Sequence, residues 1–498
     1  MGKRKRRSTA VEADILVIGG GLAGLAAAVA CSSRPGERRL RVHLVGGGRG
    51  GAPGPLVLFS PEAQREARGL LGDRMPDGWA VESDQALWAG PRRWRRLPWK
   101  GSGPRRDHRV YDRDRLLAAL EATAREQGVE THPGARALSL LFRGERVVGA
   151  VVGSAAGLRR DPLRAAGTCI ADGSAGSLSR ALFDAARLGE GKGAPTWGGL
   201  IEETWRRSER QPGSGQVLRS FGWPAPRGLF GGGVVIEGAD RVTVRFLVEV
   251  GPRAAGIDPW ALHGRWRRHP VVAGRLEGAE LLARRAGLLP LGGYWSLPRL
   301  AAAGAVLAGS AGGLFDPWTL EGADLALLSG ARAGRTLRGA VAEGECAAAR
   351  LMAYDRQVKD SVVGQQLFAG RRFAPLAARG AMALATARLL EPLTPRRDPR
   401  LGGADFPVAV PELPREETFS VRAGGAAARA WLIDAEQCRR YCTRDRPAPC
   451  LSFCPADVFR PAPSGQGVVI EAERCVGCRI CLAADPFGVV GVSPCIED

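Results

Sequence analysis

Residues 14–31 read DILVIGGGLAGLAAAVAC, a short apolar run followed by glycines and then by alanine-rich sequence. The apolar run predicts a buried strand, and the alanine-rich part predicts a helix. Between them Gly19, Gly21 and Gly24 have the G-x-G-x-x-G spacing. The first glycine of that pattern allows a tight turn, the second lets a pyrophosphate approach the backbone, and the third lets the helix pack on the strand. With a second strand at 41–45, this order predicts a βαβ dinucleotide-binding unit.

One position departs from the usual pattern of such units. An acidic residue is expected at the end of the second strand, where it binds ribose hydroxyls, but the chain has Gly46 there, in the run VGGGRGG. The pattern therefore predicts the dinucleotide fold and leaves the occupancy of its cofactor site open.

Composition limits the classes of protein and partner. A chain of 498 residues with 45% hydrophobic content is long enough for about two to four domains. The net charge of +20 favours nucleic acid, anionic lipid or an acidic protein as partner. Because the arginines are scattered and no known nucleic-acid-binding motif occurs, we expect no nucleic acid. The basic leader at 1–13 is interpreted as a solvated tail, or alternatively as a weak anchor to an anionic membrane.

No uninterrupted apolar stretch of about 18 residues is present, so the sequence predicts no transmembrane helix and a soluble or peripheral protein. Cysteine usage points to metal. Eight of the eleven cysteines fall at or beyond 438, and in a large chain without an export signal such clustering favours metal ligation over disulfides. The other three, Cys31, Cys169 and Cys346, are expected to be small core residues.

Several further segments carry a family likeness when they are taken in order. They are DGSAGSL, PLGGYWSLPRL, AGSAGGLFDPWTLEGADLAL, FCPADVF and CVGCRICLAADP. Together with the N-terminal glycines, this order resembles the electron-transfer flavoprotein:ubiquinone oxidoreductase family and its nitrogen-fixation-type relatives, over nearly the whole chain. The first part alone also resembles the broader geranylgeranyl-reductase-like flavoproteins.

The resemblance implies one [4Fe-4S] cluster near the C-terminus. Its expected ligands are Cys475, Cys478 and Cys481 together with Cys454, which precedes a proline. In two-cluster ferredoxins the cysteine before proline ligates the other cluster, which agrees with this assignment. Asp485 then stands where a ligand of a lost cluster would be.

Other cysteines leave two interpretations open. The spacing of Cys442, Cys450 and Cys454 is similar to that of ferredoxins with a three-iron or modified first cluster. A second cluster would use Cys442 and Cys450 with a third group, for which the candidates are Cys438, Cys495 and Asp485. The alternative is that these are spare thiols or ligands of a different metal.

For the flavin the resemblance implies FAD, with its pyrophosphate at the three N-terminal glycines and Arg113 near the cofactor. Asp172 and Gly173 would close the adenine side. The second flavin motif contains Gly309 and Gly312, and Ser310 stands where an acid is usual. No catalytic residue is nominated, because the cofactors themselves supply the electron chemistry.

The predicted fold class is therefore α/β, with a Rossmann-like FAD-binding domain, an inserted α+β substrate subdomain and a C-terminal α+β ferredoxin-like iron-sulfur domain. The expected divisions are the basic leader 1–13, the FAD-binding domain 14–189 and 301–397, the substrate or quinone subdomain 190–300, the linker 398–429 and the ferredoxin-like domain 430–498.

The leading hypothesis is an enzyme that relays electrons from an electron-transfer flavoprotein, or another redox protein, to a membrane quinone. We expect it in the cytoplasm, or peripheral on the cytoplasmic face of the inner membrane. One alternative is an FAD-dependent reductase of a lipid or isoprenoid with a built-in ferredoxin. Another is a degenerate flavin fold that acts only as a ferredoxin-type electron carrier.

Overall fold

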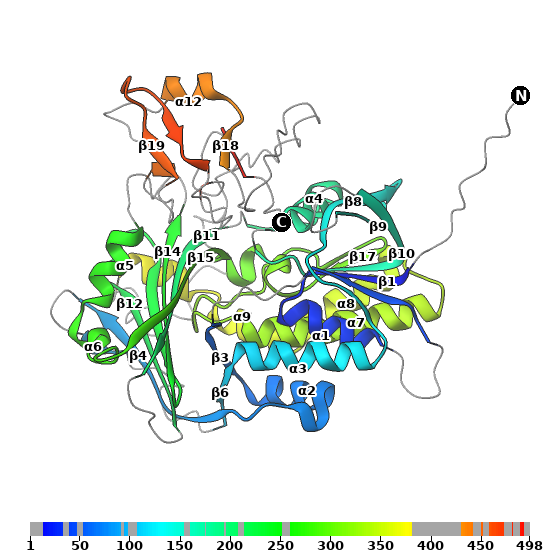
Figure 1. Cartoon of the computed structure of the whole chain (residues 1–498), viewed down its shortest axis with the longest axis horizontal. Helices are drawn as coiled ribbons and strands as arrows, with labels where there is room; N and C mark the ends of the chain where they lie inside the picture. The colour runs from blue at the N-terminus through cyan, green and yellow to red at the C-terminus, as the bar shows by residue number, and fades with distance from the viewer. Residues whose placement is uncertain are drawn as a thin grey trace, which may run out of the picture.

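The computed structural model describes the chain in segments: 13–32, 39–46, 53–90, 94–97, 107–153, 160–174, 176–193, 196–207, 214–250, 259–380, 430–441, 450–451, 458–472, 481 and 489–492. Two large β-sheets, helices that pack on them and a small C-terminal group of elements make up these residues (Figure 1).

The first sheet contains the parallel βαβ unit that the N-terminal motif predicts. Its main path runs β16-β17-β10-β1-β2-β7, and the neighbours from β17 to β7 are parallel. Strands β8 and β9 extend it as an antiparallel meander from β10. The bounds are β1 (Ala13–Ile18), β2 (Val42–Val45), β7 (Glu130–His132), β8 (Arg136–Arg143), β9 (Arg146–Gly153), β10 (Arg160–Ile170), β16 (Ala301–Ala302) and β17 (Ala305–Leu307). The Rossmann-like part of the fold prediction is confirmed.

Helices α1, α3 and α7 lie side by side below this sheet in Figure 1, with α4 beside the meander above it. All ten residues of α1 are buried, which explains why its sequence is alanine-rich and lacks a polar face. The helices of this unit are α1 (Leu22–Cys31), α2 (Pro61–Leu71), α3 (Arg113–Glu126), α4 (Ser177–Ala185), α7 (Ala323–Ala342), α8 (Ala348–Asp360), α9 (Val362–Gly370) and α10 (Phe373–Arg379).

Helices α1 and α7 approach each other at backbone distance. A Cβ added at Gly330 would lie 2.1 Å from the backbone oxygen of Ala23, and one at Gly334 would lie 2.4 Å from that of Ala27. Both pairs advance by four residues in the same direction, so the two helices run parallel and their N-termini lie at the same end. Only glycine allows this separation, because any side chain on α7 would collide with main-chain atoms of α1.

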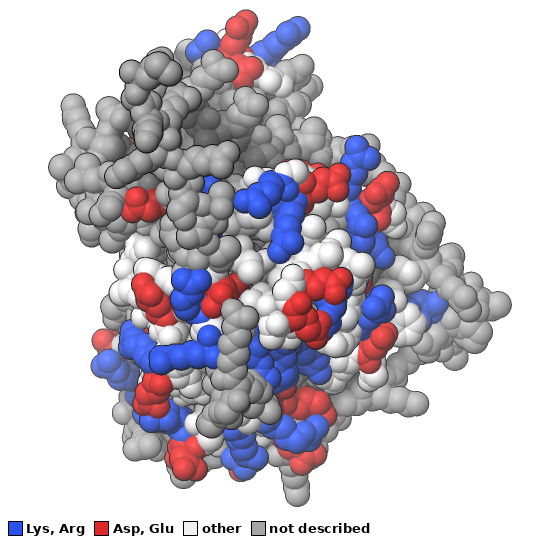
Figure 2. All heavy atoms as spheres, turned by 90° about the vertical axis from the view of Figure 1, so that its right-hand side faces the viewer, with Lys and Arg blue, Asp and Glu red and all other residues white. Residues whose placement is uncertain are grey.

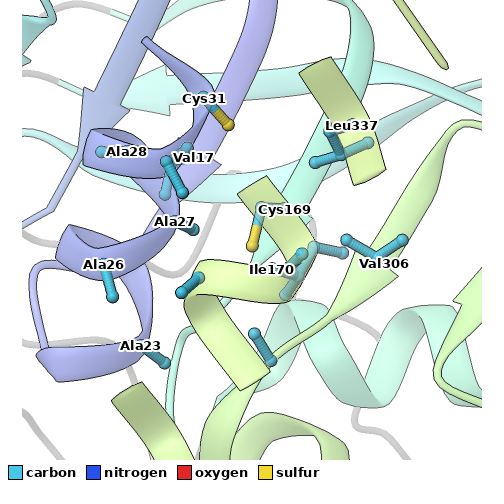
Figure 3. Close-up of a cluster of buried hydrophobic side chains, with 14 of the residues drawn as sticks. Val17, Ala23, Ala26, Ala27, Ala28, Cys31, Cys169, Ile170, Val306 and Leu337 are labelled. Carbon is cyan, nitrogen blue, oxygen red and sulfur yellow. The ribbon is translucent and has the colours of Figure 1, made fainter. Parts of the chain in front are cut away.

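The core around these helices is made of small and branched side chains (Figure 3). Cys31 of α1 and Cys169 of β10 are buried in it, and Cys346 is buried as well, as the sequence predicts. Burial raises the pKa of the Cys169 thiol to about 12, so this thiol stays protonated and packs as a small apolar group.

The second sheet is assembled from two separate parts of the chain. Its order is β15-β11-β14-β13-β12-β4-β6-β3, with β5 on β4, and the pair β12 and β4 is parallel. Residues 56–112 supply β3 (Leu56–Phe59), β4 (Trp79–Ala89), β5 (Trp94–Arg96) and β6 (Arg109–Asp112). Residues 197–290 supply β11 (Trp197–Arg206), β12 (Ser214–Gly222), β13 (Gly231–Glu237), β14 (Arg241–Val250) and β15 (Glu280–Pro290). The sequence analysis anticipated only the strands at 197–290. It placed residues 56–112 in the FAD-binding domain, because they stand in the sequence between β2 and α3 of that unit.

Helices α5 (Pro259–Arg267) and α6 (Pro270–Ala273) cover part of this sheet, where Trp266 is fully buried. Among the residues that the structure describes, no helix is both long enough and apolar enough to cross a bilayer.

The C-terminal elements form two small antiparallel pairs. β18 (Ala430–Leu432) pairs with β21 (Val490–Val492), and β19 (Phe459–Pro461) pairs with β20 (Val468–Ile470). Helix α12 (Ala435–Tyr441) follows β18, and the group stands apart from the two large sheets at the top of Figure 1. Cys438, Cys450 and Cys481 share its small buried core. The ferredoxin-like assignment stays a prediction.

Replacement of Gly330 by alanine tests the contact between α1 and α7. The new methyl group would overlap main-chain atoms of Ala23, so we expect a loss of about 1–3 kcal/mol and a lower Tm by scanning calorimetry or fluorimetry. The matched control is Gly339→Ala on the same helix, where the only neighbour within 4 Å is the side chain of Arg350. The control should be neutral or slightly more stable than the native chain. Equal effects in both variants would contradict the close approach.

Candidate functional site

A cavity of about 400 Å³ lies between the dinucleotide-type sheet and the second sheet. The end of β1 and the start of α1 form one side of it, and the segment before α7 forms another. Strands β11, β14 and β15 supply the opposite wall through Leu200, Glu202, Arg245, Arg285 and Leu289. The cavity is therefore bordered by both sheets and by two helix N-termini, and it opens to solvent.

The three glycines of the N-terminal motif have three different roles. Gly19 has φ +114°, and a Cβ on it would lie 2.1 Å from the backbone oxygen of Ala171. A Cβ on Gly24 would lie 1.8 Å from the backbone oxygen of Gly19, so this residue lets α1 pack on the turn. Gly21 lines the cavity, and no atom of the described residues lies within 4 Å of its Cβ position. The open space over Gly21 is what a bound pyrophosphate requires of this turn.

Helices α1 and α7 both begin at the cavity. Gly21 precedes α1 and Gly322 precedes α7, and neither helix start has a side-chain cap. Both glycines line the cavity. The first backbone N–H groups of a helix carry a partial positive charge and lack partners within the helix, so two such starts at one cavity fit a ligand with more than one anionic or acceptor group.

The charged side chains that line the cavity come from the second sheet, from α3 and from the segment before α7. They are the guanidinium groups of Arg113, Arg245 and Arg285 and the carboxylates of Glu202 and Glu321. Arg113 is the first residue of α3, and burial lowers its pKa, an effect that nearby Glu202 opposes. The charged groups that line the cavity thus include more guanidinium groups than carboxylates.

Arg245 joins four segments of the chain at this wall. Its Nε donates to Glu202 Oε2 at 2.6 Å, its Nη1 to Glu321 Oε1 at 2.8 Å and its Nη2 to the backbone oxygen of Leu56 at 2.7 Å. Burial alone would lower the pKa of Arg245, but the two carboxylates together raise it above its ordinary value. The guanidinium therefore stays charged and fixes the loop before α7 against the second sheet.

Three carboxyl groups lie buried between this wall and α7. Asp316 accepts from Thr319 Oγ1 and Gln366 Nε2, at 3.0 and 2.9 Å, and Asp324 accepts from the backbone N–H of Leu325 at 2.8 Å. Burial raises the pKa of Asp316 and of Glu321, and it raises that of Asp324 to about 7, with Glu321 and Asp316 adding to the effect. A carboxyl group that changes its charge near neutral pH thus lies in the first turn of α7.

The other predicted flavin-site residues lie around the cavity in different roles. Gly173 lines it, whereas the carboxylate of Asp172 accepts from the backbone N–H groups of Leu178 and Ser179, at 2.9 and 3.1 Å, and so caps α4. In the 3₁₀ turn Gly309–Gly312 it is Ser310 that lines the cavity.

The two glycines of that turn serve packing. Gly309 has φ +63°, and a Cβ on it would lie 2.9 Å from the Cβ of Ala23. A Cβ on Gly312 would lie 2.8 Å from the side chain of Leu300. Gly46, which stands where an acid was expected, has φ +95° and lies against Gly19. A residue with a side chain rarely adopts that φ, so the backbone path explains the missing acid.

The predicted metal ligands fall mostly outside the described residues. Of the expected cluster ligands, only Cys481 is described, and it is buried. Cys454, Cys475 and Cys478 lie outside the described segments, as do Cys442, Asp485 and Cys495. From the alternative second set, Cys438 and Cys450 are described and share the core of Cys481.

The sequence analysis missed the charged wall and the buried acids. A signal for the wall was present in RVTVRFLVEV at 241–250, where Arg241, Thr243 and Arg245 alternate with apolar residues and so share one face of a strand. The acids gave no comparable signal, because Asp316, Glu321 and Asp324 stand in a loop and a helix start whose burial depends on the second sheet.

Two protein-family models match the chain. Residues 197–289 match one described as ETF-QO, ubiquinone-binding, and residues 59–203 match one described as FAD binding domain. The first match contains the five wall residues contributed by β11, β14 and β15.

Curated relatives match nearly the whole chain. The mitochondrial electron transfer flavoprotein-ubiquinone oxidoreductase of Homo sapiens is 25% identical, with 96% of this chain and 86% of that protein covered. The resemblance to this family is confirmed. The probable electron transfer flavoprotein-ubiquinone oxidoreductase of Schizosaccharomyces pombe is 24% identical, with 96% and 83% covered, and the Arabidopsis thaliana protein is 24% identical, with 96% and 82% covered.

Solved structures show the same fold at lower identity. A geranylgeranyl bacteriochlorophyll reductase-like protein from Thermoplasma acidophilum has a TM-score of 0.57 and 18% identity and covers 77% of this chain and 99% of that one. A myxobacterial FAD-dependent halogenase has a TM-score of 0.53 and 17% identity, with 78% and 92% covered. The family model at 59–203 supports FAD as a cofactor of this chain.

Removal of the Arg245 guanidinium tests the network at the cavity wall. Arg245→Met leaves two buried carboxylates without their cation, so we expect a loss of about 3–5 kcal/mol, measured as a lower Tm or denaturation midpoint. The matched control is Arg206→Met on the same sheet, which removes an exposed ion pair with Glu280 and should cost at most about 1 kcal/mol. Similar losses in both variants would show that the network does not hold the wall.

Asp324 should make stability depend on pH in a defined direction. Its pKa is about 7 in the folded chain and near 4 in the unfolded chain, so between those values the folded state holds a proton that the unfolded state has released. The protonated carboxyl group of Asp324 therefore contributes fully to the free energy of unfolding below about pH 4, and this contribution is lost as the pH rises through about 7.

Asp324→Asn keeps the acceptor for Leu325 and removes the titration. The difference in stability between the variant and the native chain should therefore shift in favour of the variant as the pH rises from 5.5 to 8.5. The expected shift in the free energy of unfolding is on the order of a few kcal/mol, measured as a change in the Tm difference. A Tm difference that is the same at both pH values would contradict the assignment.

Proposed function

We propose that this chain is a flavin and iron-sulfur oxidoreductase that relays electrons from an electron-transfer flavoprotein, or a similar donor, to a membrane quinone. The observation that carries the proposal is the composition of the cavity. A glycine turn suited to a dinucleotide forms one side, and the segment that matches a ubiquinone-binding family model forms the other. One cavity is thus bounded by the parts that would bind the flavin and by those related to a quinone site.

FAD, when bound, supplies the chemistry, because a flavin exchanges electrons one or two at a time and so links a one-electron donor to a two-electron acceptor. The chain binds and orients it. The backbone at Gly21 leaves room for the pyrophosphate, and the start of α7 at Gly322 offers backbone N–H donors. Arg113 and Arg285 present positive charge to the cavity, and Arg245 holds the wall in place.

The C-terminal part would hold one [4Fe-4S] cluster through Cys454, Cys475, Cys478 and Cys481, in a ferredoxin-like domain at 430–498. The sequence spacing and the family relatives support this assignment, and Cys481 lies in a buried core as a cluster ligand would. The burial of Cys438 and Cys450 in the same core keeps a second cluster as the alternative proposal.

The proposed domain division keeps the FAD-binding, quinone and iron-sulfur parts expected from the sequence, with the change that residues 56–112 add strands to the second sheet. The proposed location is peripheral on the cytoplasmic face of the inner membrane, with an anionic membrane surface as a further partner. On the face that Figure 2 shows, lysines and arginines of the described residues are interspersed with acids and do not form one basic patch. That distribution favours several weak charge contacts with a redox partner over one deep nucleic-acid groove.

The decisive experiment uses the holoprotein, purified without oxygen. Flavin, iron and sulfide per chain are measured first. The protein is then reduced with reduced electron-transfer flavoprotein and mixed with a short-chain ubiquinone. One FAD, about four irons and reoxidation by the ubiquinone would support the proposal, and seven or eight irons would add the second cluster. Transfer to an isoprenoid double bond in place of the quinone, or iron without flavin, would replace it with one of the two alternatives.

Gly21→Leu separates cofactor binding from folding. The site has nothing within 4 Å of the Cβ position and a φ of −84°, which any residue adopts, so a leucine would enter the cavity without strain. We expect FAD content and ubiquinone reduction to fall at least about 10-fold, with an unchanged circular dichroism spectrum. Gly69→Leu on α2, which also has open space at its Cβ and does not line the cavity, should keep both. Full flavin content in Gly21→Leu would contradict the assigned pyrophosphate position.

A further inference from the structure

Three potential metal ligands meet at the edge of the first sheet, away from the dinucleotide cavity. His43 lies on β2, and Glu130 and His132 lie on β7, the strand at the end of the main path. The parallel register places His43 opposite Glu130 and Val45 opposite His132. Because side chains alternate along a strand, Glu130 and His132 point to the same face of the sheet, where His43 joins them.

Pairs of donor atoms from the three side chains lie close together, and the two contacts of His43 use different nitrogens of its ring. Nδ1 of His43 lies 3.0 Å from Nε2 of His132. The carboxylate of Glu130 lies 3.5 Å from Nε2 of His43 and 3.6 Å from Nε2 of His132. Metal bonds of about 2.0–2.2 Å at tetrahedral or square angles put neighbouring ligand atoms roughly 3 to 3.5 Å apart. One ligand atom from each residue can be chosen so that all three lie within 4.8 Å of one another.

The three side chains of this group differ in how far they are exposed to solvent. The side chain of His43 is 11% exposed, that of His132 is 31% exposed and that of Glu130 is 63% exposed. The sheet backbone therefore holds the two imidazoles on one side and leaves the opposite side open to solvent. Such a site offers three protein ligands and a remaining position for water.

The ligand types select a class of ion. Two imidazoles and one carboxylate suit divalent first-row transition metals such as zinc, whereas calcium and magnesium prefer sets made only of oxygen atoms. The two imidazoles are stacked with ring centroids 5.2 Å apart, and Nδ1 of His43 lies within hydrogen-bond distance of Nε2 of His132. A metal ion binds imidazole in its neutral form, so it would take the place of this contact between the rings.

We propose that His43, Glu130 and His132 form a binding site for a divalent transition-metal ion of the zinc class, which fastens the edge strand β7 to β2. β7 is joined to β2 by three residue pairs only, so a metal bond across them would add substantially to its attachment. The strand β2 leads directly to Gly46, which lies against Gly19 of the dinucleotide turn. The site would thus stabilise the part of the sheet that supports that turn, and it does not depend on the proposed electron relay.

Zinc binding to the holoprotein tests the proposal, with the iron-sulfur cysteines occupied by their own metal. Calorimetric titration with Zn²⁺ should show one site that His132→Gln weakens about 100-fold and Glu130→Gln weakens at least about 10-fold. The control is His108→Gln. His108 is half-buried, directly precedes β6 and lies outside the proposed site, so this variant should bind Zn²⁺ as the native chain does. Saturating Zn²⁺ should also raise the Tm of the native chain and of His108→Gln but not that of His132→Gln.

A spectroscopic probe distinguishes this site from cysteine ligation. Cu²⁺ bound to the native holoprotein should give an electron paramagnetic resonance spectrum with couplings to two imidazole nitrogens, and His132→Gln should lose one of them. Zinc affinity that is equal in the native chain and in both site variants would overturn the proposal, and so would a copper spectrum dominated by sulfur. Glu130 is mostly exposed, so its variant provides a folded comparison even if His132→Gln is unstable.

Discussion

The close contact between α1 and α7 is the constraint on which the site depends. Glycines of α7 lie against main-chain oxygens of α1, and the two helices consequently run parallel with adjacent N-termini. Each helix start offers backbone donors, but one start alone would bind only one group of a dinucleotide. Because the two starts meet, a single extended ligand can be bound at its pyrophosphate and near its ring system at once. The need for small residues explains the alanine and glycine content of both helices.

Ion pairs between buried side chains also hold the cavity wall in place. Arg245 links the second sheet to the loop before α7, so the segment that matches the ubiquinone-binding family model is held against the start of that helix. The same loop and the first turn of α7 carry buried acids whose pKa values are raised by burial. A change of charge at a ligand in the cavity would therefore be felt by Asp324, whose pKa of about 7 lets it take up or release a proton near neutral pH. Positive and ionisable groups are combined within one small volume.

The sequence predicted local features well and distant pairings poorly. The strand, turn and helix at residues 14–31 follow from local glycine spacing, and the structure has them as expected. The cysteine core residues and the return of the chain to the first unit were likewise visible. The second sheet was only half anticipated, because β4 finds its partner β12 more than a hundred residues later and no local pattern encodes that pairing. For the same reason His43 and His132 appeared unrelated in sequence, although neighbouring strands bring them into contact.

The parallel pair of β4 and β12 has a consequence for how this protein comes into being on the ribosome. When β4 emerges during synthesis, its partner β12 has not yet been made, and the same is true of α7, the helix that α1 needs. One edge of β4 therefore stays unpaired until β12 has been translated, and α1 stays without its partner until α7 has been translated. Folding of this kind is slow and prone to aggregation, so the early segment is where we expect chaperones to bind the nascent chain. The cavity, which β11, β14, β15 and the start of α7 complete, is among the last features to form.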